Sequence, residues 1–309
     1  MYFPGITTQV GQAEVLTRLP DSFRRVQSTT WADANKSGEP IDSFLEGPLF
    51  DDLGNLYVTD IPFGRVFRID PAGKWELIVQ YDGEPNGMKW LKPGVLLITD
   101  YKNGLMSLDV RRGVVEPFLQ RRNSESFKGV NDLSFDRQGN LYFTDQGQTG
   151  LHDPTGRVYR LRPSGQLDLL LSNVPSPNGL VLSPDEKFLF VAATRGNEVW
   201  RAALMTDGTV SKVGRFFVSH GPSGPDGLAM DAKGNLVIAN PGLGCVWLLD
   251  HLACPIWVWK SAAGRALTNV AFGGVDGRTL YCTESETGSI LAIQMPNAGN
   301  IVHSGHSAD

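Results

Sequence analysis

Residues 176–182 read Ser-Pro-Asn-Gly-Leu-Val-Leu, and residues 224–230 read Gly-Pro-Asp-Gly-Leu-Ala-Met. Both stretches place a polar residue and a glycine before an apolar residue, a variable residue and a second large apolar residue. The same order, usually with the glycine, recurs in segments that begin at Glu46, Asn86, Asn131, Asn178, Asp226 and Thr268. Successive segments start 40 to 48 residues apart. A period of this length is typical of the four-stranded blades of a β-propeller.

Each segment is followed by further strand signals. A Gly-Asn pair marks a hairpin turn at Gly54, Gly139 and Gly234, and runs such as Leu56-Tyr-Val-Thr-Asp60 follow it. Third and fourth strand-like runs follow, as at residues 157–161 and 167–171. We therefore predict an all-β fold, a six-bladed β-propeller of four-stranded antiparallel blades that start near residues 46, 86, 131, 178, 226 and 268.

The two ends of the chain indicate how the ring closes. The last repeat has three clear strands, and a strand-like segment at residues 12–19 precedes the first repeat without a blade of its own. We predict that this N-terminal strand completes the sixth blade. With no amphipathic helix of convincing length and no linker, residues 1–309 are expected to form a single domain.

Composition excludes several classes of function. The net charge is −5 and the pI about 5.6, and no cluster of Lys and Arg is interleaved with aromatic residues, which argues against a nucleic-acid partner. The N-terminus has no basic leader with an apolar run, and no stretch approaches the roughly 18 apolar residues of a membrane span. We expect a cytoplasmic protein, with Cys245, Cys254 and Cys282 as reduced, buried thiols.

Because the first strand of each propeller blade lines the central channel, the six initial residues of the repeats should form a ring around the axis. Two carboxylates and three carboxamides that converge there are costly to bury unless a cation satisfies them. All are oxygen donors, which favours a hard ion, Ca²⁺ or Mg²⁺, over zinc. Ca²⁺ is our default, with Zn²⁺, Mg²⁺, Mn²⁺ or Fe²⁺ as alternatives. The competing interpretation is that Asn-Gly and Asp-Gly are turn dipeptides.

Other polar residues are weaker candidates. The Thr-Asp pairs at Thr59, Thr99 and Thr144 are interpreted as structural, because they end the second strands. His152 lies in a long loop that could wall a substrate site, and His220 shares a loop with Asp226; for both, an ordinary surface histidine is the alternative. Neither a serine-hydrolase nor a nucleotide-binding motif is present.

The ring and its neighbours resemble the senescence-marker-protein/gluconolactonase/luciferin-regenerating-enzyme family. The resemblance covers nearly the whole chain, and its matching stretches are residues 45–48, 57–62, 131–132, 176–179 and 224–227. It implies a six-bladed propeller and, for most members, a metal-dependent lactonase. It also implies that Glu46, Asn178 and Asp226 are metal ligands, and that Asn131 is a ligand or a substrate contact.

The chain departs from the family at two places. Animal gluconolactonases carry an Arg two residues before the Asn of the Asn-Asp motif, whereas Gly129 stands here, so specificity for sugar lactones is not implied. In the drug-responsive lactonase branch the ligand is the carboxylate that corresponds to Asp132. Asn131 and Asp132 are therefore alternatives at the metal.

These residues predict a hydrolase that opens a small lactone. A bound divalent ion would polarise the carbonyl as a Lewis acid, and water would attack it, with Asp226 as general base. Asn86, Asn131, Asp132 and His152 are the predicted substrate contacts. A metal-dependent organophosphate (phosphotriester) hydrolase and a non-catalytic metal-binding propeller are the alternatives.

Overall fold

The computed structural model describes residues 7–305, in which strands form four four-stranded sheets, one eight-stranded sheet and one short hairpin. The first two four-stranded sheets contain β2 (Leu45–Phe50), β3 (Leu56–Asp60), β4 (Arg65–Ile69) and β5 (Trp75–Gln80), then β6 (Pro85–Lys92), β7 (Val95–Asp100), β8 (Gly104–Asp109) and β9 (Val114–Leu119). The next two contain β12 (Val130–Phe135), β13 (Leu141–Asp145), β14 (Gly156–Leu161) and β15 (Leu167–Val174), then β16 (Pro177–Leu182), β17 (Phe188–Ala193), β18 (Glu198–Leu204) and β19 (Val210–Val218). The hairpin pairs β10 (Arg121–Arg122) with β11 (Glu125–Ser126).

The eight-stranded sheet joins the two ends of the described chain. It contains β20 (Leu228–Met230), β21 (Leu236–Asn240), β22 (Cys245–Leu249), β23 (Pro255–Ser261), β24 (Leu267–Gly273), β25 (Thr279–Glu284), β26 (Ser289–Gln294) and β1 (Gln9–Arg18). The strand predicted at residues 12–19 corresponds to β1. Residues 14–18 of β1 pair antiparallel with β26, and residues 9–13 pair in parallel with β23, which the sequence did not predict. At ten residues, β1 is long enough to reach both partners.

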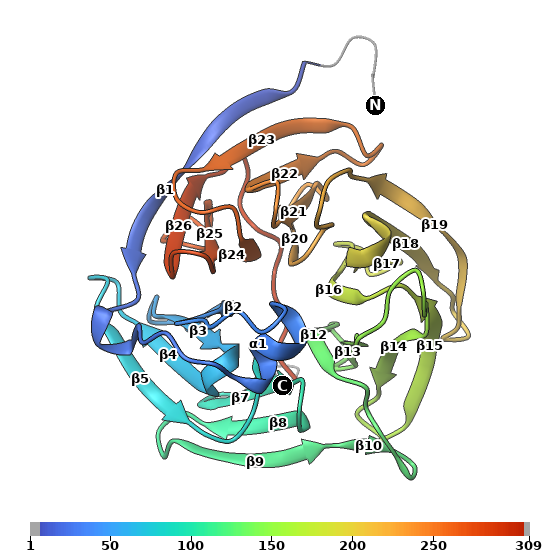
Figure 1. Ribbon diagram of the computed structural model, residues 1–309. Helices are drawn as coiled ribbons and strands as arrows, with labels where there is room; N and C mark the ends of the chain where they lie inside the picture. The colour runs from blue at the N-terminus through green and yellow to red at the C-terminus, as the bar shows by residue number, and fades with distance from the viewer. Residues whose placement is uncertain (1–6, 306–309) are drawn as a thin grey trace.

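The sheets stand around a central axis, with β2, β12, β16, β20 and β24 innermost (Figure 1). β6 is also an inner strand, since it is the edge strand of its sheet and contacts β2 and β12. This is an all-β, propeller-like fold with few and short helices. Neighbouring inner strands contact one another, as β2 does with β6 and with β24. No helix in residues 7–305 is long and apolar enough to cross a membrane.

Asp side chains hold several hairpins that connect the first and second strands. Asp51 Oδ1 accepts hydrogen bonds from the backbone N–H groups of Leu53 and Asn55, and Asp136 and Asp231 repeat the arrangement in their own turns. This local side-chain bonding explains why Asp, Gly and Asn recur at this point of the repeats.

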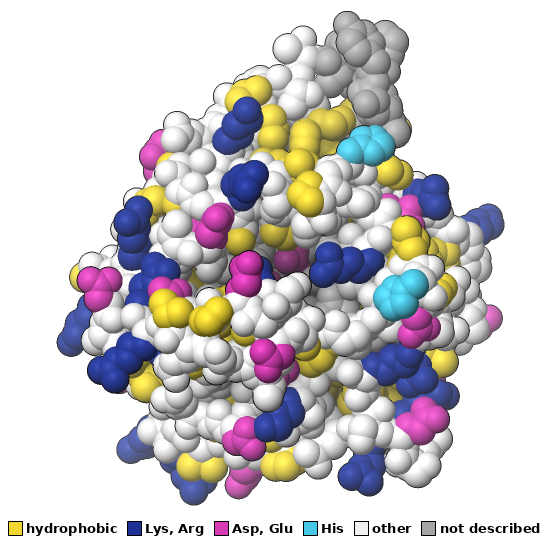
Figure 2. Space-filling view, viewed as in Figure 1, with side chains coloured by type: hydrophobic (Ala, Val, Ile, Leu, Met, Phe, Trp, Pro, Cys, Tyr) yellow, Lys and Arg dark blue, Asp and Glu magenta, His cyan; other side chains and the backbone are white. Residues whose placement is uncertain are grey.

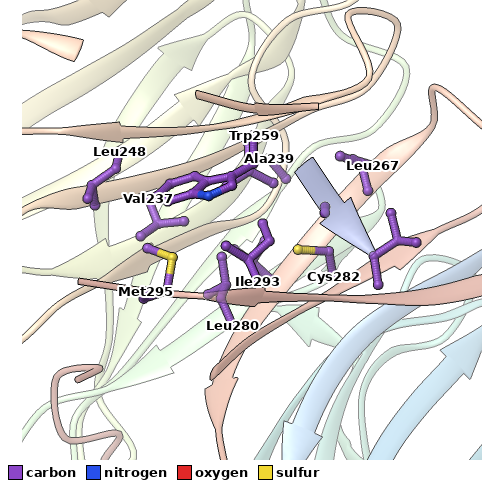
Figure 3. Packing of buried hydrophobic residues seen from close by; sticks show 13 residues of the cluster. Val237, Ala239, Leu248, Trp259, Leu267, Leu280, Cys282, Ile293 and Met295 are labelled. Atoms are coloured by element: carbon purple, nitrogen blue, oxygen red, sulfur yellow. The ribbon is translucent and has the colours of Figure 1, made fainter. Parts of the chain in front are cut away.

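Apolar side chains pack between the sheets rather than at one centre. In the eight-stranded sheet, Val237, Leu248 and Trp259 from one half face Leu280 and Ile293 from the other half (Figure 3). Cys282 is fully buried in the same cluster. All three cysteines are buried and free, as expected, and burial raises the pKa of the Cys245 thiol to about 12.

Two segments outside the repeats cover the ends of the axis. Between β1 and β2 the chain forms η1 (Asp21–Phe23) and the short helix α1 (Thr30–Asn35), which lies over the centre of the ring in Figure 1. Thr29 caps α1, because its side chain accepts a hydrogen bond from Ala32 N–H at 3.0 Å. Two further short helices, η2 (Ile61–Phe63) and η3 (Thr194–Gly196), follow β3 and β17.

The last described residues cross the other end of the axis. Asn300 N–H donates to the Met230 carbonyl at 2.8 Å, and Gly305 N–H donates to the Trp90 carbonyl at 3.1 Å. The C-terminal segment therefore runs from the neighbourhood of β20 to that of β6.

Candidate metal centre

The inner strands are irregular at the positions that the repeat singles out. In five of them the pairing register shifts at the ring residue, between Glu46 and Leu49, Pro85 and Met88, Val130 and Leu133, Pro177 and Leu180, and Leu267 and Asn269. Such bulges re-aim a side chain and are frequent next to functional sites. The irregularity lets a residue of a sheet point toward the axis.

The glycines that follow the ring residues serve close packing, not turns. A Cβ on Gly47 would lie 2.2 Å from the Asn86 carbonyl oxygen, and one on Gly179 would lie 2.4 Å from the Asp226 carbonyl oxygen. These glycines lie inside strands β2 and β16. The turn interpretation of the Asn-Gly dipeptide is therefore wrong at Gly179, because only glycine allows adjacent inner strands to approach this closely. Gly47, which follows a glutamate, also has a φ of 54°.

Threonines at the ends of second strands link each sheet to the next one. Thr59 Oγ1 donates to the Asn86 carbonyl at 2.8 Å, and Thr144 Oγ1 donates to the Asn178 carbonyl at 2.8 Å. The predicted structural role of the Thr-Asp pairs is confirmed for the partner acid too, since Asp145 Oδ1 accepts from Gly129 N–H at 2.9 Å. The backbone of each of these ring residues is thus held by the preceding sheet.

Five of the six ring residues line one cavity of about 730 Å³: Glu46, Asn86, Asn131, Asn178 and Asp226. All five are at most 7% exposed. Figure 2 shows the hollow at the centre of this face, with an acidic side chain deep inside and charged side chains around it. Thr268 is the exception, because its hydroxyl is taken up by the Leu45 carbonyl at 2.8 Å and by Thr283.

Four side-chain oxygens of this ring are buried without a hydrogen-bond partner in the described structure. They are Oδ1 of Asn86, Asn131, Asn178 and Asp226. Two hydrogen bonds orient the Asn131 carboxamide. Its Nδ2 donates to Gln146 Oε1, and Gln146 Nε2 donates to Ser176 Oγ, both at 2.9 Å. Buried oxygens left unbonded are destabilising, and a cation is the partner that suits an all-oxygen set.

Burial disfavours the ionised forms of Glu46 and Asp226, the two carboxylates of the ring. Burial raises the pKa of Glu46 to about 7, although its Oε2 accepts hydrogen bonds from Gly47 N–H and Asn269 Nδ2, each at 2.8 Å. Burial, followed by the charges of Glu46 and Asp132, raises the pKa of Asp226 well above its usual range. A divalent cation would offset both charges. In residues 7–305 no three His, Cys, Asp or Glu residues group as a metal site, so carboxamide oxygens must complete any ligand set here.

Three candidates lie elsewhere. Asp132 lines a separate cavity of about 180 Å³ under the C-terminal segment, and its Oδ1 accepts from Leu133 N–H at 2.8 Å. His152 and His220 are exposed and do not line the cavity of Glu46.

A second ring of cavity residues was missed from the sequence. Each comes directly after a second strand of a sheet: Ile61, Tyr101, Gln146, Thr194, Pro241 and Ser285. Because their residue types differ, these six residues form no recognisable sequence motif. Their constant position after the second strand of each repeat could have predicted them. Trp31 and Phe44 from the segment around α1 add an apolar wall.

Comparison with known proteins identifies the family. The model of the SMP-30/Gluconolactonase/LRE-like region matches residues 44–286, which include all six ring positions. The chain belongs to this family. Within the family it is 30% identical over 249 residues to the lactonase drp35 of Staphylococcus aureus strain MRSA252, a match that covers 76% of this chain and 74% of the relative.

Solved structures show the same fold at lower sequence identity. Regucalcin from Agrobacterium tumefaciens strain C58, described as a calcium-binding protein, superimposes with a TM-score of 0.75 at 21% identity, covering 97% of this chain and 100% of that one. A gluconolactonase from Xanthomonas campestris superimposes with a TM-score of 0.72 at 22% identity, covering 93% and 98%.

Proposed function

We propose that this chain is a metal-dependent lactonase, and that one divalent ion binds to Glu46, Asn131, Asn178 and Asp226 at the floor of the 730 Å³ cavity. The observation that carries the proposal is the group of four buried, unbonded oxygens in that cavity. The lactonase names of the family relatives support the choice of reaction. We also propose that the fold has six blades. The eight-stranded sheet would supply two of them, and β1 would complete the last one.

Calcium is the ion we propose. Ca²⁺ accepts six to eight oxygen ligands in flexible geometry, whereas Mg²⁺ demands a near-ideal octahedron. A ring of carboxylates and carboxamides on separate sheets suits the more tolerant ion. Asn86, whose Oδ1 is also unbonded, is placed at the same cavity and would contact the ion or the substrate.

The residues of the cavity have distinct roles in the proposed reaction. When bound, the ion would act as a Lewis acid toward the lactone carbonyl. Asp226 accepts a proton from the attacking water, whose oxygen bonds to the carbonyl carbon. The bond between that carbon and the ring oxygen breaks, the ring oxygen takes up a proton, and the product is a hydroxy acid. Asn269 keeps Glu46 in place by the 2.8 Å hydrogen bond to Oε2.

Gly129 and Tyr101 shape the part of the cavity in which the substrate would bind. A Cβ at Gly129 would lie 2.6 Å from the Tyr101 ring, so the ring fills the space that a side chain at residue 129 would need. Tyr101 also lines the cavity and bonds to Gln148 Nε2 through its hydroxyl at 3.0 Å. Substrates should therefore be recognised by other residues than the Arg of animal gluconolactonases. We propose the cytoplasm as the compartment, since the three free thiols suit a reducing environment.

A pH-stat screen of γ- and δ-lactones beside a phosphotriester tests the reaction. The screen uses the full chain with Ca²⁺ and, in parallel, Mg²⁺, Mn²⁺, Zn²⁺ or Fe²⁺. Acid release from at least one lactone, and none from the phosphotriester, is the expected result. Turnover of the phosphotriester alone would replace the lactonase proposal, and turnover of neither would reduce the chain to a binding protein.

A further inference from the structure

Two cationic side chains from distant parts of the chain line the cavity above the proposed ion. Lys36 follows α1, and Arg195 lies in η3 between β17 and β18. The cavity has two further cationic residues: Arg24 is paired with Asp42 at 2.9 Å, and Arg265 lies beside Glu286, whose Oε2 accepts its backbone N–H at 2.6 Å. Within residues 7–305, neither Lys36 nor Arg195 has a carboxylate oxygen within 4.0 Å. These two charges are therefore available to a ligand.

Both cations line the same cavity as the ring residues, with Lys36 half-buried and Arg195 exposed. The Lys36 ammonium lies 4.8 Å from the centroid of the Phe44 ring, and the side chain is only partly exposed. Burial lowers the pKa of Lys36, with the charge of Arg195 acting in the same direction and those of Glu286 and Glu39 opposing it. The charge of Arg195 also acts on Asp226.

Cations at this place are unfavourable for the ion itself. They repel a divalent ion as it enters the cavity, so binding of the ion does not explain their presence there. Glu286 and Glu39 offset part of the Lys36 charge, although within residues 7–305 neither forms an ion pair with it. An ammonium and a guanidinium that face one cavity form strong, charge-assisted bonds to a carboxylate.

We propose that the substrate is a lactone that also carries a free carboxylate, which Lys36 and Arg195 bind while the ester group lies over the ring. This inference rests on the proposed function for the ester half of the substrate. The cavity of about 730 Å³ has room for such a substituent beyond a single five-membered ring.

A matched pair of probes tests the inference. 5-Oxotetrahydrofuran-2-carboxylate and its carboxamide share the same lactone and differ in charge. Their kcat/KM values and their binding by titration calorimetry are measured on the full chain with Ca²⁺, for wild type, Lys36→Gln and Arg195→Gln. Arg111→Gln, which removes a charge from an exposed turn between β8 and β9, is the control.

The wild type should prefer the carboxylate, and each cavity variant should lower the ratio of carboxylate to carboxamide roughly tenfold to a hundredfold in both kcat/KM and affinity. The control should keep the wild-type ratio. If the wild type showed equal kcat/KM values and equal affinities for the two probes, the inference would be overturned while the lactonase proposal stands. Tighter binding of the carboxylate without any turnover would support the anion site and count against the lactonase proposal, whereas binding of neither probe would overturn the anion site.

Discussion

The two ends of the central channel are built from the same inner strands and differ in chemistry. β16 contributes Asn178 to the 730 Å³ cavity at one end and Leu182 to the 180 Å³ cavity at the other end. The first end holds four buried oxygens that lack a hydrogen-bond partner among residues 7–305. Among the described residues that line the second cavity, no buried side-chain nitrogen or oxygen lacks a hydrogen-bond partner.

This difference separates a binding end from a structural end. Buried polar atoms in native proteins are bonded in the great majority of cases, so a cluster of exceptions requires a partner. The second end needs none, because buried polar side chains that line it, such as Asp132, already have hydrogen-bond partners, and residues 300–303 cover it. We therefore place the proposed ion and substrate at the end with the 730 Å³ cavity.

Loss of the proposed base at the polar end should have the largest effect. Asp226→Asn keeps an oxygen in the ring but removes the carboxylate, so kcat with saturating ion should fall by about 10²–10⁴. Val302→Ser, at the other end, should leave kcat unchanged. Glu46→Gln removes the same charge without touching the base; equal losses in both ring variants, each recovered by added ion, would make Asp226 a ligand only.

Gly179 lies in β16 between the two ends of the channel, and its replacement tests the close packing of the inner strands. In Gly179→Ala the new Cβ would meet backbone atoms of Asp226 and Leu228 at 2.4 and 2.7 Å. The inner strands must move apart, and we expect a loss of about 1–3 kcal/mol in the free energy of unfolding. Gly214→Ala is the control, because nothing lies within 4 Å of its Cβ position. Equal melting temperatures for the two variants would contradict the packing argument.

Removal of the C-terminal segment that covers the second end should affect stability more than turnover. A chain that ends at Asn297 keeps the 2.8 Å hydrogen bond from Asn297 to Asp231 but loses the segment that contacts Met230 and Trp90. We expect a lower melting temperature and nearly unchanged KM for the lactone. A large rise in KM would show that substrate contacts reach through the ring.

The smallest loss of stability is expected when one side-chain hydrogen bond between neighbouring sheets is removed. Thr59→Val removes the hydroxyl that donates to the Asn86 carbonyl, which should cost about 0.5–1.5 kcal/mol, the net contribution of one hydrogen bond to stability. Thr59→Ser keeps the hydroxyl and should recover most of that stability in urea unfolding. A Ser variant no better than Val would mean that packing, not the hydrogen bond, is what Thr59 provides.

The sequence predicted the parts of the molecule that repeat. The five ring residues that line the cavity share one repeat position, and the strand pattern around them is periodic. Elements that occur once were missed: α1, the parallel pairing of β1 with β23, and the C-terminal cover have no second copy to reveal them. Arg195 and Tyr101 were missed for another reason, because their repeat position is fixed while their residue type is not.

The most direct test of the central claim is a calcium titration into metal-stripped protein, followed by calorimetry and by the rate of lactone hydrolysis on the same samples. The account predicts no turnover without the ion, return of turnover in step with binding of one equivalent, and a melting temperature that rises with ion concentration because only the folded ring binds it. Full lactone turnover by the stripped protein, with no binding of any divalent ion, would contradict it.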